Sequence, residues 1–397
     1  MRKLSAQYII TGIGEVLVKG VVIMNDDGVV TNIIDTKGEL SEIAGVEFYN
    51  GVLVPGFINS HCHLELSHLH GFFPEKTGLP EFLKNVTEHR NPTGNQLVDT
   101  ARRADFDLWK NGVVAVGDVS NTNDTFKLKS ESKIKYHTFI EALGFSPQRA
   151  ERAFGWALYC LDEARTLGLS ASIVPHSPYA ISERLFEMIS EFASDQKSIY
   201  SIHNQECSHE DDLFLTGKGE IARHMTENLN IDLSFFHPTG NPALESIINL
   251  IPKENNLLFV HNIRTGQKDI DLIAKTRSLN KTWFVLCPNS NLYIEDCLPD
   301  IELFRKNRLQ ICLGTDSLSS NHSLSILDEM KTIQAHFPEI PFTEFVSWAT
   351  RNGAEALGME QWAGTIEKGK KPGINLITGI DLQHLKLLPH SKVKRLI

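Results

Sequence analysis

The chain has 397 residues, which is too long for one ordinary domain, and its 41% hydrophobic and 22% charged residues are typical of a globular protein rather than a disordered one. It carries 39 basic and 49 acidic residues, a net charge of −10. Nucleic acid is therefore excluded as an expected partner, because the chain has no basic excess to replace the counterions of a polyanion.

The sequence gives no sign of a membrane or an export pathway. No run approaches the roughly 18 apolar residues of a membrane span, and Met1–Ile10 lacks the apolar core and cleavage site of a signal peptide. The six cysteines are scattered and include no CxxC pair. We therefore expect a cytoplasmic protein with reduced thiols and no membrane partner.

The first 55 residues are predicted to be all β. Short apolar or alternating runs cover residues 8–11, 15–24 and 29–34, and Asn25–Gly28 is a hairpin signal between two of them. A last run leads into the break at Pro55-Gly56.

From residue 56 the sequence pattern changes, and short predicted strands alternate with longer helical patterns. The strand candidates are Phe57–Ile58 and residues 112–117, 135–140, 170–174, 199–202, 256–260, 282–286 and 311–314. The helical patterns between them include residues 97–110, 148–167, 183–194, 244–251 and 270–278. Strands separated by helices form a parallel sheet, and a count of eight favours a closed (β/α)8 or TIM barrel over an open sheet.

After Ala363 the pattern becomes short and β-like again over residues 364–377. β segments at both ends of a barrel can combine into one small domain. We therefore predict an α/β protein with a composite β-sandwich domain, residues 1–55 and 364–397, and a barrel domain, residues 56–363.

The strongest local signal stands at the end of the first barrel strand, in Pro55-Gly-Phe-Ile-Asn-Ser-His61-Cys62-His63. Residues two apart in an extended segment point to the same side, so His61 and His63 can bind one ion. Two imidazoles suit zinc or iron(II). The same alternation turns Cys62 away from that ion.

Polar side chains also follow the later strand candidates. His176 follows the fourth strand, His203 and Glu206 the fifth, His261 the sixth and Asp316 the eighth. In a (β/α)8 barrel these strand ends share the face on which active sites are built. The sequence therefore predicts one site that contains all of these side chains.

This ordered set resembles the amidohydrolase superfamily, and within it the branch of cytosine deaminases and of triazine- and adenosine-type deaminases. The resemblance covers nearly the whole chain. It rests on the opening motif that ends at His63, on His176-Ser-Pro-Tyr179, on His203-x-x-Glu206, on His261, on Gly314-Thr-Asp316 and on Gly364-Thr-Ile-Glu-Lys-Gly-Lys370.

The resemblance implies a role for each matching position. One divalent metal is expected on four ligands, which are His61, His63, His203 and Asp316. His261 is expected to orient the attacking water, Glu206 to shuttle protons to the substrate ring, and His176 to contact the substrate.

The residue types suit this chemistry. A bound metal lowers the pKa of its water towards neutrality and makes hydroxide available. Asp316 can accept the proton of that water during attack on a ring carbon that carries an amino group. Glu206, three residues after His203, can protonate the adjacent ring nitrogen and help expel ammonia. That role needs a carboxyl that keeps its proton near neutral pH, which burial favours.

One absence bears on the metal count. Two-metal members of the superfamily usually bridge their metals with a carboxylated lysine on the fourth strand, and Ser170–His176 contains no lysine. We therefore expect one metal per chain, with zinc as first choice and iron(II) or manganese as alternatives, and deamination of a ring rather than two-metal hydrolysis of an amide or ester.

The substrate is inferred from a narrower resemblance. His63–Ser67, Gly314–Asn321 and Gly369–Leu376 resemble the corresponding segments of aminodeoxyfutalosine deaminases, which act on a 6-aminopurine nucleoside. In that case Glu65 is expected to accept hydrogen bonds from the ribose diol, and Arg90 to meet a carboxylate. The expected partners are thus a small heterocyclic substrate and water, with a homodimer by analogy to the superfamily.

Several alternatives keep the same fold. A triazine-type enzyme would displace chloride or an alkylamine, and a smaller pocket would suit a free base such as guanine or cytosine. A two-metal hydrolase and a non-catalytic scaffold are the more distant alternatives.

Overall fold

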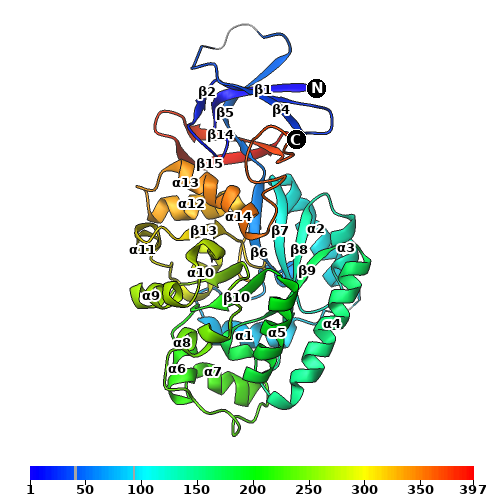
Figure 1. Ribbon diagram of the computed structural model, residues 1–397, viewed down its shortest axis with the longest axis vertical. Helices are drawn as coiled ribbons and strands as arrows, with labels where there is room; N and C mark the ends of the chain where they lie inside the picture. The colour runs from blue at the N-terminus through cyan, green and yellow to red at the C-terminus, as the bar shows by residue number, and fades with distance from the viewer. Residues whose placement is uncertain (40–42, 93) are drawn as a thin grey trace.

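The computed structural model describes residues 1–39, 43–92 and 94–397 (Figure 1). Two four-stranded parallel sheets form its centre, and all eight strands predicted after residue 56 are present. In order they are β6 (Phe57–Cys62), β7 (Val113–Ser120), β8 (Lys135–Ala142) and β9 (Ser170–Pro175), then β10 (Tyr200–Asn204), β11 (Leu257–His261), β12 (Thr282–Leu286) and β13 (Gln310–Leu313).

Backbone hydrogen bonds link the edges of these two sheets at both ends. At the β9 edge, the N–H of His203 donates to the carbonyl of His176 at 2.9 Å. Beyond β13, the N–H groups of Thr315 and Asp316 both donate to the carbonyl of His61, at 3.0 and 3.1 Å. The chain segments that carry the predicted site residues are thus bonded directly to one another.

The strands are apolar on both faces because each face is covered. In β11, Leu257 and Phe259 pack into the larger core cluster, whereas Leu258 and Val260 pack into a second cluster. Strands buried on both faces are typical of parallel sheets that helices cover.

Helices follow most of the strands. Their bounds are α1 (Leu79–His89), α2 (Gln96–Lys110), α3 (Phe126–Glu131), α4 (Ala150–Thr166), α5 (Glu183–Gln196), α6 (His209–Thr216), α7 (Glu220–Arg223), α8 (Ala243–Ile247), α9 (Gln267–Thr276), α10 (Pro288–Glu295), α11 (Ile301–Lys306), α12 (Ile326–His336), α13 (Phe342–Ala349) and α14 (Arg351–Ala356). The helix predicted over residues 244–251 is shorter than expected, since α8 gives way to a 3-10 turn at Ile248–Leu250. Pro252 follows at once and disfavours helical backbone in the residue before it. No helix in the described ranges has the length and apolar character that crossing a membrane would require.

Strands from both ends of the chain share one seven-stranded sheet (Figure 1). Its order is β15 (Lys386–Arg395), β14 (Ile374–Asp381), β5 (Val46–Pro55), β1 (Arg2–Ile9), β3 (Val21–Met24) and β4 (Val30–Ile34), with β2 (Leu17–Val18) beside β1. The predicted hairpin turn joins β3 to β4, and β5 pairs antiparallel with β14. This sheet has its own core cluster, which contains Leu4, Met24 and Leu376.

The C-terminal β prediction is only partly correct. Residues 364–373 form turns and irregular backbone rather than strand, and β14 starts at Ile374. Gly364, Gly369 and Gly373 have φ values of 83°, 91° and 69°, which interrupt extended backbone.

Candidate functional site

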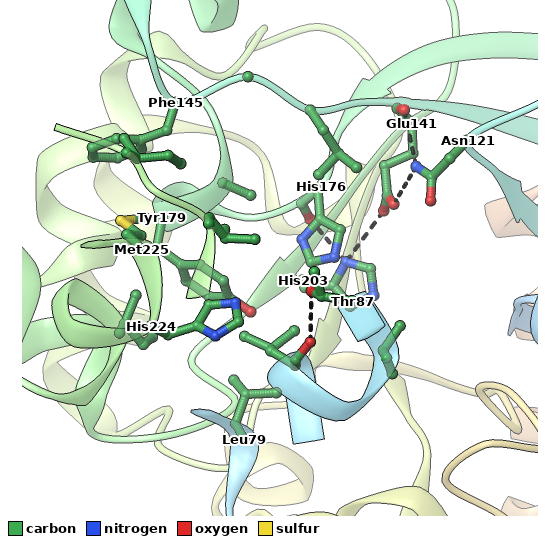
Figure 2. A pocket seen from close by; sticks show the side chains of 18 of the residues that line it. Leu79, Thr87, Asn121, Glu141, Phe145, His176, Tyr179, His203, His224 and Met225 are labelled. Atoms are coloured by element: carbon green, nitrogen blue, oxygen red, sulfur yellow. Dashed lines mark hydrogen bonds and ion pairs between the residues drawn. The ribbon is translucent and has the colours of Figure 1, made fainter. Parts of the chain in front are cut away.

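A cavity of about 640 Å³ lies at the carboxyl ends of the parallel strands (Figure 2). Six of the strand-end side chains predicted from the sequence line it, namely His63, His176, His203, Glu206, His261 and Asp316. His61 is completely buried beside them, with its ring centroid 4.8 Å from that of His63. The structure thus brings the strand-end residues together as the sequence predicted.

Four side-chain atoms converge on one point of this cavity. The Nε2 atom of His63 lies 3.1 Å from Nε2 of His61 and 3.3 Å from Nε2 of His203. Oδ1 of Asp316 lies 3.5 Å from Nε2 of His63 and 3.7 Å from Nε2 of His61. Bonds of about 2.0–2.1 Å to a tetrahedral zinc would space the ligand atoms about 3.3 Å apart. The four atoms therefore have the spacing of a metal ligand set.

The protonation of these groups also suits a cation. Burial lowers the pKa of His63 and of His203 well below the usual range, and neighbouring histidines add to the effect. Nδ1 of His203 lies 2.8 Å from the carbonyl oxygen of His176 and therefore carries the proton that it donates. Its Nε2 lone pair then faces the other three atoms. Converging lone pairs beside a carboxylate suit a divalent ion such as zinc, iron(II) or manganese.

Two serines hold the carboxylate of Asp316 in place. The hydroxyls of Ser290 and Ser320 both donate to Oδ2 at 2.7 Å, which leaves Oδ1 directed at the histidines. Burial alone would raise the pKa of Asp316, but its interactions with His61 and the other histidines outweigh burial and hold that pKa well below its usual value. Sequence reasoning did not single out either serine.

Two features hold the segment before Asp316 close to His61, namely a glycine at position 314 and the side-chain amide of Asn59. A Cβ added at Gly314 would lie 2.9 Å from both the Cβ and the carbonyl oxygen of His61, so only glycine permits this approach. The amide of Asn59 donates to Oγ1 of Thr315 at 2.7 Å and accepts the N–H of Thr315 at 3.1 Å. These contacts fix the last strand end against the first.

Several strand-end residues have left-handed backbone. Gln205, His261, Asn262 and Asp316 have φ values of 50°, 73°, 59° and 56°. Such conformations are uncommon for residues other than glycine and collect at functional sites, where neighbouring contacts hold them.

Glu206 lines the cavity and has an exposed fraction of only 4%. Burial raises its pKa well above the usual range, and the charge of Asp316 raises it further. Its carboxylate lies 3.7 Å from Nε2 of His261, whose Nδ1 donates to the side-chain oxygen of Asn291 at 2.8 Å. The N–H of Glu206 itself donates to the carboxylate of Glu210 at 2.6 Å. Glu206 is therefore a buried carboxyl on the cavity wall with a raised pKa.

His176 stands between the converging atoms and the rest of the cavity. Its ring stacks on that of His203 with a centroid separation of 4.5 Å. Burial, with a contribution from the charge of Arg90, lowers its pKa to about 3, so the imidazole is neutral. Its buried Nδ1 has no hydrogen-bond partner among the described residues.

The structure separates the two residues expected to contact a nucleoside. Arg90 lines the cavity, whereas Glu65, only 3% exposed, is not among the described residues that line it. The Glu65 carboxylate accepts the N–H of Asn121 at 3.1 Å and the guanidinium of Arg90 at 3.4 Å. Burial raises its pKa to about 7. Glu65 therefore binds Arg90 and Asn121 on the side away from the cavity. It was expected to contact the sugar inside the cavity.

Glu141 and Asn121 also line the cavity, and sequence reasoning missed both of them. Glu141, at the end of β8, accepts a hydrogen bond from the amide of Asn121 at 3.0 Å (Figure 2). The guanidinium of Arg90 donates to the side-chain oxygen of Asn121 at 2.7 Å. Burial raises the pKa of Glu141 to about 7. Because Glu141 ends the third strand, the strand-end rule that singled out His176 would also have found it.

The remaining wall of the cavity is largely apolar. Helix α1, the π-helical turn at His224–Asn228 and the segments around Phe145 and Phe235 provide it. Its apolar side chains include Leu79, Phe82, Leu83, Val86, Phe145, Met225, Ile231 and Phe235.

Comparison with known proteins assigns the chain to a family. Residues 52–394 match the amidohydrolase family, so the chain belongs to that family, as the motifs indicated. It is 28% identical over 336 residues to an adenosine deaminase of Helicobacter pylori, which covers 83% of this chain and 79% of that protein. It is 27% identical over 357 residues to an aminodeoxyfutalosine deaminase of Nitratiruptor sp., which covers 86% and 84% of the two chains.

A solved structure shares the fold. The aminofutalosine deaminase of Helicobacter pylori in complex with methylthio-coformycin superimposes with a TM-score of 0.81 at 23% sequence identity. The superposition covers 100% of both chains, so every part of the fold described above has a counterpart there.

Proposed function

We propose that this protein is a metal-dependent hydrolytic deaminase of a 6-aminopurine nucleoside, with aminodeoxyfutalosine as the first candidate substrate. One observation carries the proposal, namely that a four-atom ligand set faces the same cavity as Glu206, a buried carboxyl with a raised pKa. The similarity to proteins named adenosine deaminase and aminodeoxyfutalosine deaminase supports this class of substrate.

The fold belongs to the proposal as well. We infer that the two parallel sheets form one (β/α)8 barrel over residues 56–363, which the hydrogen bonds at both sheet edges support. We infer that residues 1–55 and 364–397 form a composite β-sandwich domain, which the separate core cluster of the terminal sheet supports.

We propose that His61, His63, His203 and Asp316 hold one divalent ion per chain, with zinc as first choice. Nitrogen and carboxylate donors in a tetrahedral arrangement support that choice. Strand β9 has no lysine to bridge a second ion. When bound, the ion would lower the pKa of a water and so supply a nucleophile near neutral pH.

The residues of the chain then divide the proton transfers between them. Asp316 accepts the proton of the attacking water on Oδ1, while Ser290 and Ser320 hold its other oxygen. His261, held by Asn291, orients the water. Glu206 gives its proton to the ring nitrogen beside the attacked carbon. Glu206, now a carboxylate, would take the proton of the newly attached hydroxyl and pass it to the amino group. The carbon–nitrogen bond then breaks, the amino group leaves as ammonia, and the hydroxyl oxygen becomes the carbonyl oxygen of the product. The proton held by Asp316 would then restore the protonated Glu206.

The cavity favours a substituted nucleoside over a free base. Its volume of about 640 Å³ lies well within the range of sites that enclose drug-sized ligands. We place the attacked ring against the polar side chains at the strand ends, which include His176, Glu206 and Asp316. The apolar wall around Phe82, Phe145 and Met225 leaves space for a large substituent at the far end of the sugar.

Ammonia release from zinc-loaded protein tests the proposal. The panel contains aminodeoxyfutalosine, methylthioadenosine, S-adenosylhomocysteine, adenosine, guanine, cytosine and a chloro-triazine. We expect release from an adenine nucleoside, and about 10²- to 10⁴-fold less with Glu206→Gln at unchanged metal content. Turnover of only the triazine or a free base, or two metal ions per chain, would overturn the proposal.

A further inference from the structure

We propose that Glu141, together with Arg90, recognises the vicinal hydroxyl groups of the substrate's sugar and so makes the site selective for ribonucleosides. This inference rests on the proposed function and names how that same site chooses its nucleoside. The sequence assigned the contact with the sugar to Glu65, in the turn after β6, whereas we assign it to Glu141 of β8.

Glu141 lies on the cavity wall next to two histidines of the candidate site. Ligand atoms of Glu141, His176 and His203 all lie within 4.8 Å of one another. Oε1 of Glu141 lies 3.5 Å from Nδ1 of His203, and the exposed fraction of Glu141 is only 5%. A group that it binds must be close to the reacting ring, rather than at the far end of a substituent.

Among the residues that the structure describes, one carboxylate oxygen of Glu141 has no hydrogen-bond donor within ordinary range. Oε2 accepts the amide N–H of Asn121 at 3.0 Å. The nearest donor to Oε1 is Nδ1 of His203 at 3.5 Å, but that nitrogen already donates its single proton to the carbonyl of His176 at 2.8 Å. A distance of 3.5 Å is beyond the ordinary N–H···O range. Oε1 is thus a free acceptor on the cavity wall.

Arg90 provides donors in the same cavity, and the side chain of Asn121 bridges Arg90 to the other oxygen of Glu141. Only its NH2 group is engaged within the described residues, with Asn121 at 2.7 Å and Glu65 at 3.4 Å. The buried carboxylate of Glu65 and the amide of Asn121 fix the direction of the guanidinium. A hydroxyl group both donates and accepts, so adjacent hydroxyls match an acceptor next to a fixed donor. A free base or a dideoxynucleoside would leave both protein groups unpaired, which is costly in a buried site.

The wild-type protein gives the first test. The kcat/KM values of adenosine, 2′-deoxyadenosine, 3′-deoxyadenosine and 2′,3′-dideoxyadenosine are compared on zinc-loaded enzyme. We expect the ribonucleoside to be preferred over the dideoxynucleoside by at least about 100-fold, because a site built to bind a hydroxyl rejects analogues that lack it. Equal kcat/KM values would overturn the inference without any variant.

Glu141→Gln gives the second test. Because Asn121 donates to one side of residue 141, the glutamine oxygen is expected to stay there and its NH2 group to replace the free acceptor. We expect the preference for ribose to fall at least about tenfold, mainly through KM for the ribonucleoside. Glu131→Gln, at an exposed position at the end of α3, is the matched control.

Metal content distinguishes this role from a structural one. If Glu141 serves to orient His203, Glu141→Gln will lose metal and slow all four nucleosides equally, which overturns the inference. An unchanged ribose preference with full metal content also overturns it and leaves the proposed deaminase standing. If the wild-type protein deaminates a sugar-free ring and no nucleoside, both proposals fail together.

Discussion

Asp118 of β7 and Lys129 of α3 form an ion pair that solvent does not reach, since both side chains have an exposed fraction of 0%. The second oxygen of Asp118 accepts the N–H of Leu64 at 2.8 Å. Leu64 directly follows His63, so the pair holds the backbone next to a candidate metal ligand. Lys129 also donates to the hydroxyl of Ser120 at 2.8 Å, which fixes the ammonium from a second side.

Removing one partner of this pair is expected to be costly. Lys129→Met leaves a buried carboxylate without its cation, and we expect the free energy of unfolding to fall by about 3–5 kcal/mol. The double variant Asp118→Asn/Lys129→Met keeps an acceptor for Leu64 without any charge, and most of the loss is expected to be recovered. Urea denaturation of the metal-free proteins measures both. A double variant as unstable as the single one would contradict the argument.

The two serines that hold Asp316 are expected to tune metal affinity. Ser290→Ala and Ser320→Ala each remove one donor to Oδ2, which allows the carboxylate to rotate away from the histidines. We expect each variant to bind zinc about 10- to 100-fold more weakly, the usual effect of losing a group that orients a ligand. Competition with a chromophoric chelator measures the affinity. The exposed Ser130→Ala on α3 serves as control, and equal affinities for all four proteins would count against this role.

Glu210 is expected to make stability depend on pH. Burial, together with the charge of Glu206, raises the pKa of Glu210 to about 8. The folded protein therefore keeps a proton that the unfolded chain releases above its ordinary pKa of about 4.5. The stability that this proton contributes is complete below about pH 4.5 and is lost as the pH rises through about 8.

Glu210→Gln removes this titration while keeping an acceptor for the N–H of Glu206. The unfolding free energy of the variant relative to wild type is expected to increase between about pH 5 and pH 8, by at most about 1.4 kcal/mol per pH unit. Denaturation at several pH values, with saturating metal, gives the two curves. Parallel curves would show that the Glu210 carboxyl does not titrate in this window.

Gly314→Ala tests the close approach of the last strand end to the first. The new Cβ would lie 2.9 Å from the carbonyl oxygen of His61 and 3.0 Å from Sγ of Cys287. Overpacking of this kind costs about 1–3 kcal/mol, and here it would also push Asp316 away from the histidines. We expect a lower melting temperature together with weaker zinc binding. Loss of stability without loss of zinc affinity would mean that the backbone relaxes elsewhere.

The sequence predicted the parallel strands well because each is a short apolar run that lies between helical or turn patterns. It predicted the terminal sheet less well. Strand β15 is rich in lysine and contains Pro389, since it lies at the sheet edge and needs an apolar residue only where it meets the core. Its burial depends on partners from the other end of the chain, which a local pattern does not contain.

The same limit applies within the site. The candidate metal ligands could be predicted because their spacing and strand ends are sequence features. The place of Glu65 could not, because Glu65 turns away from the cavity once Asn121 and Arg90 have taken its oxygens. Which of two nearby carboxylates faces the cavity is decided by side-chain contacts between strands, not by their order in the chain.

The pairing of Asn59 with Thr315 joins positions 256 residues apart in the sequence. During synthesis the first histidines leave the ribosome long before Asp316, the one carboxylate of the proposed ligand set. A nascent chain can therefore offer imidazoles early, but the complete set of four proposed ligands exists only after the eighth parallel strand has been made and docked. Metal retention would then report on chain completion, and a product truncated before Gly314 would release its ion to any cellular chelator and remain open to proteolysis.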